Sequence, residues 1–175
     1  LFLWFGWYGF NPGSTGSLHD RQTAHVAAMA AVNTTLSPCA AGLAVFALRR
    51  LLPPRLLDVG GFCNGILGGL VSITAGCASV KHWEAIVIGG IGGFVYCGAS
   101  MLAQKLKIDD VVDAFAVHGA CGLWGVIALG FFGDPVVGGN GLFHTGKGDQ
   151  LGAQIVAVII IALWVSGISV AIFLP

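Results

Sequence analysis

The chain has 175 residues, of which 56% are hydrophobic and only 9% charged, and its mean hydropathy is +0.87. A soluble domain carries about 25% charged residues, so this composition excludes a soluble protein and predicts an all-α, polytopic membrane helix bundle. The eight basic and eight acidic residues cancel, which leaves no basic field to attract nucleic acid. We therefore expect the lipid bilayer, and no nucleic acid, among its partners.

Six apolar stretches follow one another along the chain, at residues 1–10, 23–48, 56–80, 83–106, 111–132 and 150–174. A helix needs about 20 apolar residues to cross the hydrocarbon core, and the first stretch is too short to do so. Because the chain opens at Leu1 inside an apolar run without an initiator Met, we expect this stretch to be the tail of a helix. We predict one truncated and five complete transmembrane helices, in one domain over residues 1–175 that is a fragment of a longer protein.

Glycines and short polar residues indicate how these helices pack. The third stretch contains Gly61, Gly65 and Gly69 at four-residue spacing, and the fourth contains further glycines within residues 89–93. Small residues let apolar helices approach closely, so both groups predict packing faces. The polar run at residues 33–35 of the second stretch is a further candidate for helix packing.

Basic residues in the connecting segments predict the orientation. The links after the second and fourth stretches hold five of them: Arg49, Arg50, Arg55, Lys105 and Lys107. The links on the opposite side hold three: Arg21, Lys81 and Lys147. Because loops rich in Lys and Arg stay in the cytoplasm, we expect the first group and the C-terminus to be cytoplasmic.

One ionisable side chain, His118, lies within the fifth apolar stretch. Such groups are costly at membrane depth and mark interiors or substrate pathways. A regular helix would place four small residues on the same face, namely Ala114, Cys121, Gly122 and Gly125. These neighbours would leave room for the imidazole to project into a lumen. The structural alternative is a core histidine that donates to a neighbouring carbonyl.

Acidic residues precede this histidine, at Asp109, Asp110 and Asp113. Carboxylates at a helix start accept hydrogen bonds from free N–H groups and complement the positive end of the helix. We therefore expect all three to act as helix caps. We also expect Asp113 to order the backbone or basic residues at the cytoplasmic mouth.

A rival function is a membrane enzyme or haem-binding subunit with His118 as an axial ligand. Such a site needs a second ligand at matching depth, and His25, the next candidate, lies near a helix end. We expect the remaining histidines, His19, His82 and His144, to be solvated in loops. The five cysteines have no metal-ligand spacing. We therefore expect no metal or cofactor, and a transport protein instead of an enzyme.

Aromatic residues gather at the end of the first stretch, within residues 4–10, and the polar Asn11 and Ser14 follow them. Aromatic residues are enriched where a membrane meets water, so the cluster is typical of an interfacial belt. Aromatic faces beside a hydroxyl can also hold a small cation, through cation–π attraction and one directed hydrogen bond. The residues alone leave both interpretations open.

Four segments match a known family in order and spacing: residues 6–14, 33–35, 109–122 and 141–146. Over essentially its whole length the chain resembles the ammonium transporter (Amt/Mep/Rh) family. The resemblance implies that it corresponds to the sixth to eleventh transmembrane helices of that family. It also implies an ammonium transporter-like fold, with the second inverted repeat plus the final helix.

The resemblance also implies a substrate pathway. It matches Phe10 to a gate phenylalanine, Ser14 to the outer ammonium-recruitment site, Trp7 to a pore-lining aromatic, His118 to the second of two pore histidines, Ala114 to the wall beside it and Asp113 to the inner mouth. We add Asn11, which adjoins Ser14, to this expected pathway. The partner histidine and the first gate phenylalanine belong to the family's first five helices.

The resemblance implies transport of ammonium, ammonia and methylammonium by a homotrimer in the plasma membrane. Ammonium would be recruited at the outer site and lose its proton, and ammonia would cross a hydrophobic pore. A Rh-like neutral gas channel for ammonia or carbon dioxide is the alternative. We expect His118→Ala to alter uptake by the full-length protein and His144→Ala to do little.

Overall fold

The computed structural model describes residues 1–52, 55 and 57–174, and within them it contains helices and no strand, which confirms the all-α prediction. The α-helices are α1 (Phe2–Phe10), α2 (Arg21–Leu51), α3 (Val59–Thr74), α4 (His82–Lys105), α5 (Cys121–Phe132), α6 (Leu142–Thr145) and α7 (Asp149–Phe173). Three short segments are η1 (Pro12–Thr15), the π-helical η2 (Phe115–Ala120) and η3 (Pro135–Val137). The predicted start of the third stretch, residue 56, lies outside the described residues.

Four helical segments are long and apolar enough to cross a membrane, namely α2, α4, the continuous Phe115–Phe132 and α7. The third predicted stretch forms a shorter apolar helix, because α3 has only 16 residues. Together with the family resemblance of the sequence, these helices make the chain an integral membrane protein.

The turn that follows α3 lies inside the bundle although it is not helical. Cys77 and Val80 are buried there, and buried carbonyl groups need hydrogen-bond donors. The fully buried Asn33 of α2 supplies them, since its Nδ2 donates to the carbonyls of Cys77 at 2.8 Å and Val80 at 2.9 Å. The polar packing role predicted for residues 33–35 is therefore confirmed for Asn33.

Close contacts through glycine join α2, α3 and α4. A methyl group added at Gly69 of α3 would come within 2.6 Å of Ala41 Cβ and 2.7 Å of Pro38 Cα. One added at Gly89 of α4 would overlap the backbone of Ser37. The predicted packing faces are confirmed at these glycines, whereas Gly90 has open space beside it.

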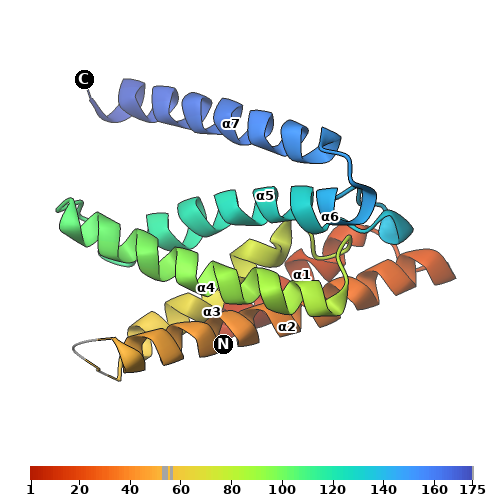
Figure 1. Ribbon diagram of the computed structural model, residues 1–175, viewed down its shortest axis with the longest axis horizontal. Coiled ribbons are helices and arrows are strands. Elements are labelled where there is room, and N and C mark those ends of the chain that lie inside the picture. The colour runs from red at the N-terminus through yellow and green to blue at the C-terminus, as the bar shows by residue number, and fades with distance from the viewer. Residues whose placement is uncertain (53–54, 56, 175) are drawn as a thin grey trace.

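Helix α7 stands apart from the other helices over most of its length (Figure 1). No part of its most apolar window is buried within the chain. It meets α5 near its N-terminal end, where a methyl group at Gly130 would come within 2.8 Å of Leu151 Cα. A long apolar surface on α7 therefore remains uncovered by the described residues.

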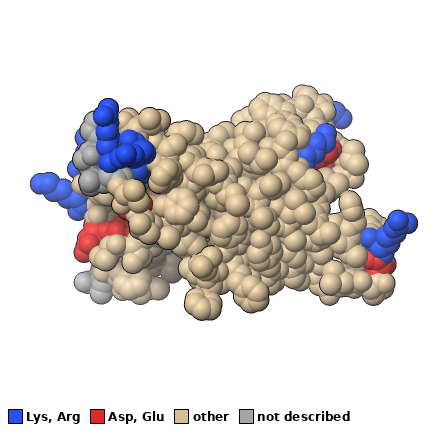
Figure 2. Space-filling view, turned by 90° about the horizontal axis from the view of Figure 1, so that it is seen from below, with Lys and Arg blue, Asp and Glu red and all other residues tan. Residues whose placement is uncertain are grey.

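Charged side chains gather at the two ends of the molecule, and the surface between them is free of charge on the face shown in Figure 2. One end contains an ion pair between Arg49 and Asp58 at 3.3 Å. Another ion pair joins Lys81, at the N-terminus of α4, to Asp134 at 3.5 Å. An uncharged band between charged ends is the pattern expected of a protein that spans a membrane.

Candidate functional site

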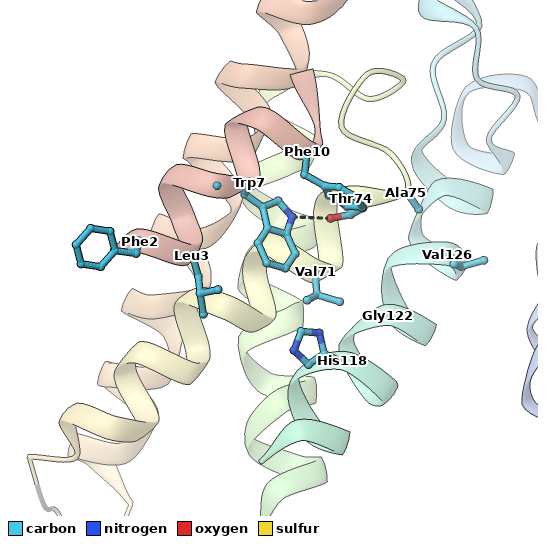
Figure 3. Close-up of a pocket in the computed structure, with 11 residues that line it drawn as sticks. Phe2, Leu3, Trp7, Phe10, Val71, Thr74, Ala75, His118, Gly122 and Val126 are labelled. Atoms are coloured by element: carbon cyan, nitrogen blue, oxygen red, sulfur yellow. Dashed lines mark hydrogen bonds between the residues drawn. The ribbon is translucent and has the colours of Figure 1, made fainter. Parts of the chain in front are cut away.

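A pocket of about 600 Å³ lies between α1, α3 and the helix formed by η2 and α5. Its walls are almost entirely apolar. The lining residues are Phe2, Leu3, Gly6, Trp7, Phe10, Val71, Thr74, Ala75, His118, Gly122 and Val126. The structure therefore brings three of the predicted pathway residues, Trp7, Phe10 and His118, to one pocket (Figure 3).

The aromatic side of the pocket comes from α1. The indole of Trp7 donates from Nε1 to the hydroxyl of Thr74 at 3.0 Å, a bond drawn in Figure 3. Its ring meets that of Phe10 edge-on, with centroids 5.9 Å apart and an interplanar angle of 75°. Two directed contacts therefore hold the Trp7 ring at the pocket wall.

His118 lies in the π-helical segment η2, so the residues around it have a different register from that of the regular helix we expected. A π-turn adds one residue and often occurs at functional sites. Of the predicted small neighbours, Gly122 lines the pocket with His118. Ala114 is exposed outside the pocket.

The other two predicted neighbours of His118 pack in another direction. The thiol of Cys121 donates to the carbonyl of Gly92 at 3.5 Å, and a methyl group at Gly125 would come within 2.5 Å of Ser72 O. The expectation that His118 shares its face with Cys121 and Gly125 is therefore wrong, because both residues serve contacts with α3 and α4.

The His118 side chain is open to the pocket and makes no hydrogen bond with the described residues. Figure 3 shows its ring below Trp7 and Val71. The sequence left open a core histidine that donates to a neighbouring carbonyl, but the described residues give this ring no such bond. An imidazole with free ring nitrogens in apolar walls can both donate and accept a hydrogen bond.

Asp110 and Asp113 anchor the start of the helix that carries His118. The Asp110 carboxylate accepts hydrogen bonds from the backbone N–H groups of Ala114 at 2.7 Å and Phe115 at 2.9 Å, which confirms its capping role. Asp113 accepts from Tyr96 Oη at 2.8 Å and Ser100 Oγ at 3.0 Å, and thereby ties the helix start to α4. The partners of Asp113 are hydroxyl groups, not the backbone or basic residues that we expected.

Asn11 and Ser14 lie next to the pocket and do not line it. The buried Asn11 donates from Nδ2 to Thr34 Oγ1 at 3.0 Å, so its amide joins α1 to α2. Ser14 is exposed, and its hydroxyl donates to the carbonyl of Phe10 at 2.5 Å. The aromatic segment and the Ser14 hydroxyl are therefore neighbours, as the sequence predicts.

His144 is not the solvated loop residue that we expected. Its Nε2 lies 2.6 Å from Oε1 of Glu84, whose side chain is 1% exposed, and the His144 side chain is itself only 18% exposed. His82 also has a partner, because its Nδ1 lies 2.8 Å from Oδ1 of Asn33. Of the loop histidines, His19 keeps a side chain that is 79% exposed, beside Asp20.

Sequence reasoning missed the wall formed by the end of α3, with Val71 and Thr74, and by Ala75, the residue that follows it. A hydroxyl at the end of an otherwise apolar, glycine-rich stretch is the signal that could have singled out Thr74. Its partner, Trp7, is 67 residues away in the chain, and no local pattern links the two.

Comparison with known proteins gives a consistent result along the chain. A family model described as the Ammonium Transporter Family matches residues 1–175. Ammonium transporter 1 member 2 of Arabidopsis thaliana is 43% identical over 182 residues, which cover 94% of this chain and 35% of that protein. A putative ammonium transporter of Synechocystis is 43% identical over 166 residues, covering 93% of this chain and 34% of that protein.

Solved structures agree with these relatives. Mep2 of Saccharomyces cerevisiae superimposes with a TM-score of 0.89 at 29% identity, over 99% of this chain and 42% of that chain. A sensor Amt protein superimposes with a TM-score of 0.85 at 32% identity, over 99% of this chain and 41% of that one. The chain thus spans 34–35% of the length of the two curated relatives. It belongs to the ammonium transporter family, whose named relatives are transporters and not enzymes.

Proposed function

We propose that this chain forms part of an ammonium transporter and that its apolar pocket is a section of the path taken by ammonia. The observation that carries this proposal is the His118 ring, open to a pocket with apolar walls and two aromatic side chains. The relatives named as ammonium transporters support it.

The chemistry of such a pocket favours ammonia over ammonium. An ion loses many kcal/mol of hydration when it enters hydrocarbon, whereas the neutral molecule does not. Ammonium therefore gives up its proton to water outside the apolar walls before ammonia passes between Trp7, Phe10 and His118. A ring nitrogen of His118 then exchanges a hydrogen bond with ammonia, which offsets part of the loss of water. Potassium has no proton to release and stays outside.

At the outer end, Ser14 supplies an acceptor for ammonium. Its single hydroxyl proton is donated to the Phe10 carbonyl, so the lone pairs of Oγ remain free for an N–H donor. Asn11 holds the corner between α1 and α2 through Thr34 and supports this site indirectly. At the inner end, Asp113 fixes the helix start next to Ala114.

The rest of the assembly follows from the family. We propose a homotrimer in the plasma membrane with a cytoplasmic C-terminus and with methylammonium as a second substrate. The uncovered apolar surface of α7 is consistent with further membrane helices or lipid against it. Five basic residues lie in the last turns of α2 and α4 and in the links that follow them, against three on the opposite side, and this difference supports the orientation.

The test compares His118→Ala with His19→Ala in the full-length protein. His19 is a suitable control because it is largely exposed, whereas His144 is bonded to the buried Glu84. We predict that His118→Ala lowers ammonium uptake roughly tenfold, the factor for one lost hydrogen bond of about 1.5 kcal/mol. His19→Ala should leave uptake unchanged. Uptake and membrane current are measured at equal amounts of protein in the membrane.

Equal uptake by the two variants would remove His118 from the pathway. Ammonium-dependent current that rises with membrane potential would indicate net movement of charge. Uptake without current would favour the neutral gas channel.

A further inference from the structure

The hydroxyl of Thr74 has an unusual place in the pocket, because it is bonded on both sides. It donates to the carbonyl of Leu70 at 2.8 Å, one turn earlier in α3. A hydroxyl has one proton, so the oxygen is left as an acceptor. It accepts the indole N–H of Trp7 at 3.0 Å. The direction of the Trp7 bond is thus set by the α3 backbone.

Thr74 is held in place by the end of α3 and by the turn that follows it. Asn33 donates to the carbonyls of Cys77 and Val80, and thereby secures this turn against α2. Close contact between Gly69 and Ala41 holds the preceding part of α3. The Thr74 hydroxyl is therefore a fixed point relative to the bundle core.

The Trp7 ring links the fixed Thr74 hydroxyl to the other aromatic side chain of the pocket, Phe10. Its N–H end is bonded to Thr74, and its ring meets Phe10 at an angle of 75°. Helix α1, which carries both rings, has no buried residue, so core packing does little to fix them. The bond to Thr74 joins the two aromatic side chains to the rigid part of the protein.

We propose that Thr74 is a positioning residue that sets the orientation of Trp7, and through it Phe10, and so determines how the pathway discriminates between ammonium and methylammonium. This inference rests on the proposed transport function. Without the acceptor, the indole has no fixed partner and can turn in the pocket, so the space between Trp7 and Phe10 becomes less defined. The larger substrate gains most from such a change.

The experiment uses the full-length protein and two substitutions that differ in the hydroxyl. Thr74→Val keeps the shape of the side chain and removes the acceptor, whereas Thr74→Ser keeps the acceptor and removes a methyl group. We expect Thr74→Val to lower the ammonium-to-methylammonium ratio of kcat/KM by about two- to tenfold, the range for one hydrogen bond. Thr74→Ser should keep the wild-type ratio. Both ratios are measured at equal protein in the membrane.

A double-mutant cycle with Trp7→Phe identifies the bond itself. Phenylalanine has no N–H donor, so Thr74→Val should have no further effect on the ratio in that background. If Thr74→Val fails to reach the membrane, Thr74→Ala replaces it, with the same expected loss and the same comparison with Thr74→Ser.

The outcomes separate this inference from the function on which it rests. Wild-type protein that takes up ammonium, together with an unchanged ratio in Thr74→Val, overturns the positioning role alone. The same conclusion follows if the effects of Trp7→Phe and Thr74→Val are additive. Wild-type protein without ammonium uptake overturns the proposed function.

Discussion

At the scale of single residues, the structure assigns different tasks to polar groups that look alike in the sequence. The buried amide of Asn11 donates to the side chain of Thr34, whereas that of Asn33 donates to the backbone carbonyls of a turn. His118 is open to the pocket, whereas His144 is bonded to the buried carboxylate of Glu84. Its free ring nitrogens set His118 apart as a candidate for contact with substrate.

Asn33 provides a stability prediction at this scale. Asn33→Ala leaves the carbonyls of Cys77 and Val80 without their donor and removes the contact with His82. We predict a loss of about 1–3 kcal/mol for each unsatisfied group, seen as a lower melting temperature of the full-length protein in detergent. The neighbouring Val32→Ala, at an exposed position, should have a small effect. Equal melting temperatures for the two variants would contradict the assigned role.

At the scale of elements, helix packing in this chain depends on which side of a helix each glycine faces. Gly89 and Gly90 are adjacent in α4, but only Gly89 lies against the Ser37 backbone. Gly69 plays the corresponding part in α3, against α2. The packing of α3 and α4 against α2 therefore depends on close approach of the helix backbones at these glycines. Any side chain larger than hydrogen would prevent this approach.

This contrast predicts opposite effects for neighbouring substitutions. Gly89→Ala should destabilise the protein by about 1–3 kcal/mol, because the methyl group overlaps the backbone of α2. Gly90→Ala should stabilise it by up to about 1 kcal/mol, because alanine favours helix and finds open space. Melting temperatures of the two full-length variants measure both effects. Destabilisation of similar size in both would show that α4 packs through another face.

At the scale of the whole molecule, the segment between α5 and α7 connects the least covered helix to the bundle. Asp134 donates its backbone N–H to the carbonyl of Ser79 at 2.8 Å, and its carboxylate pairs with Lys81. Farther along, His144 pairs with Glu84 of α4. Phe143 stacks on Phe131 in the same region. These contacts hold the N-terminal end of α7, whose remaining length extends away from α5 (Figure 1).

Asp134 makes this connection sensitive to acid. The hydrogen bond from the N–H of Val136, together with the positive charge of Lys81, outweighs the effect of burial and holds the pKa of the Asp134 carboxyl below its ordinary value of 3.8. A carboxyl group with a lowered pKa in the folded state stabilises the fold when it is ionised. Its contribution is complete above the ordinary value and is lost as the pH falls through the lowered pKa.

We therefore predict that Asp134→Asn lowers the melting temperature at neutral pH, and that its difference from wild type shrinks once the pH falls below about 4. Thermal unfolding of the full-length protein between about pH 7 and 3 measures this difference. The exposed Asp109→Asn serves as the control. A difference that stays constant down to the lowest pH would exclude the Asp134 carboxylate as its source.

The sequence by itself determined the class of protein and the approximate helices, and it singled out the leading candidate for a functional residue. Long apolar runs with few charges can satisfy their backbone in a membrane only as helices, so composition and length suffice for that prediction. The isolated ionisable group at His118 was recognisable for the same reason. The boundaries of the helices still differ from the prediction. In the third stretch the helix ends at Thr74, and Asn33 donates hydrogen bonds to the carbonyls of the turn that follows.

Only the tertiary structure decided which side chains meet. The π-helical segment changes the register around His118, so Cys121 and Gly125 pack toward α3 and α4 instead of the pocket. The pairs Trp7–Thr74 and Glu84–His144 join residues 67 and 60 positions apart. Local patterns in a sequence describe the faces of single helices. Contacts between residues far apart in the chain depend on how the helices are placed against one another, and this placement is determined by the packing of the whole bundle.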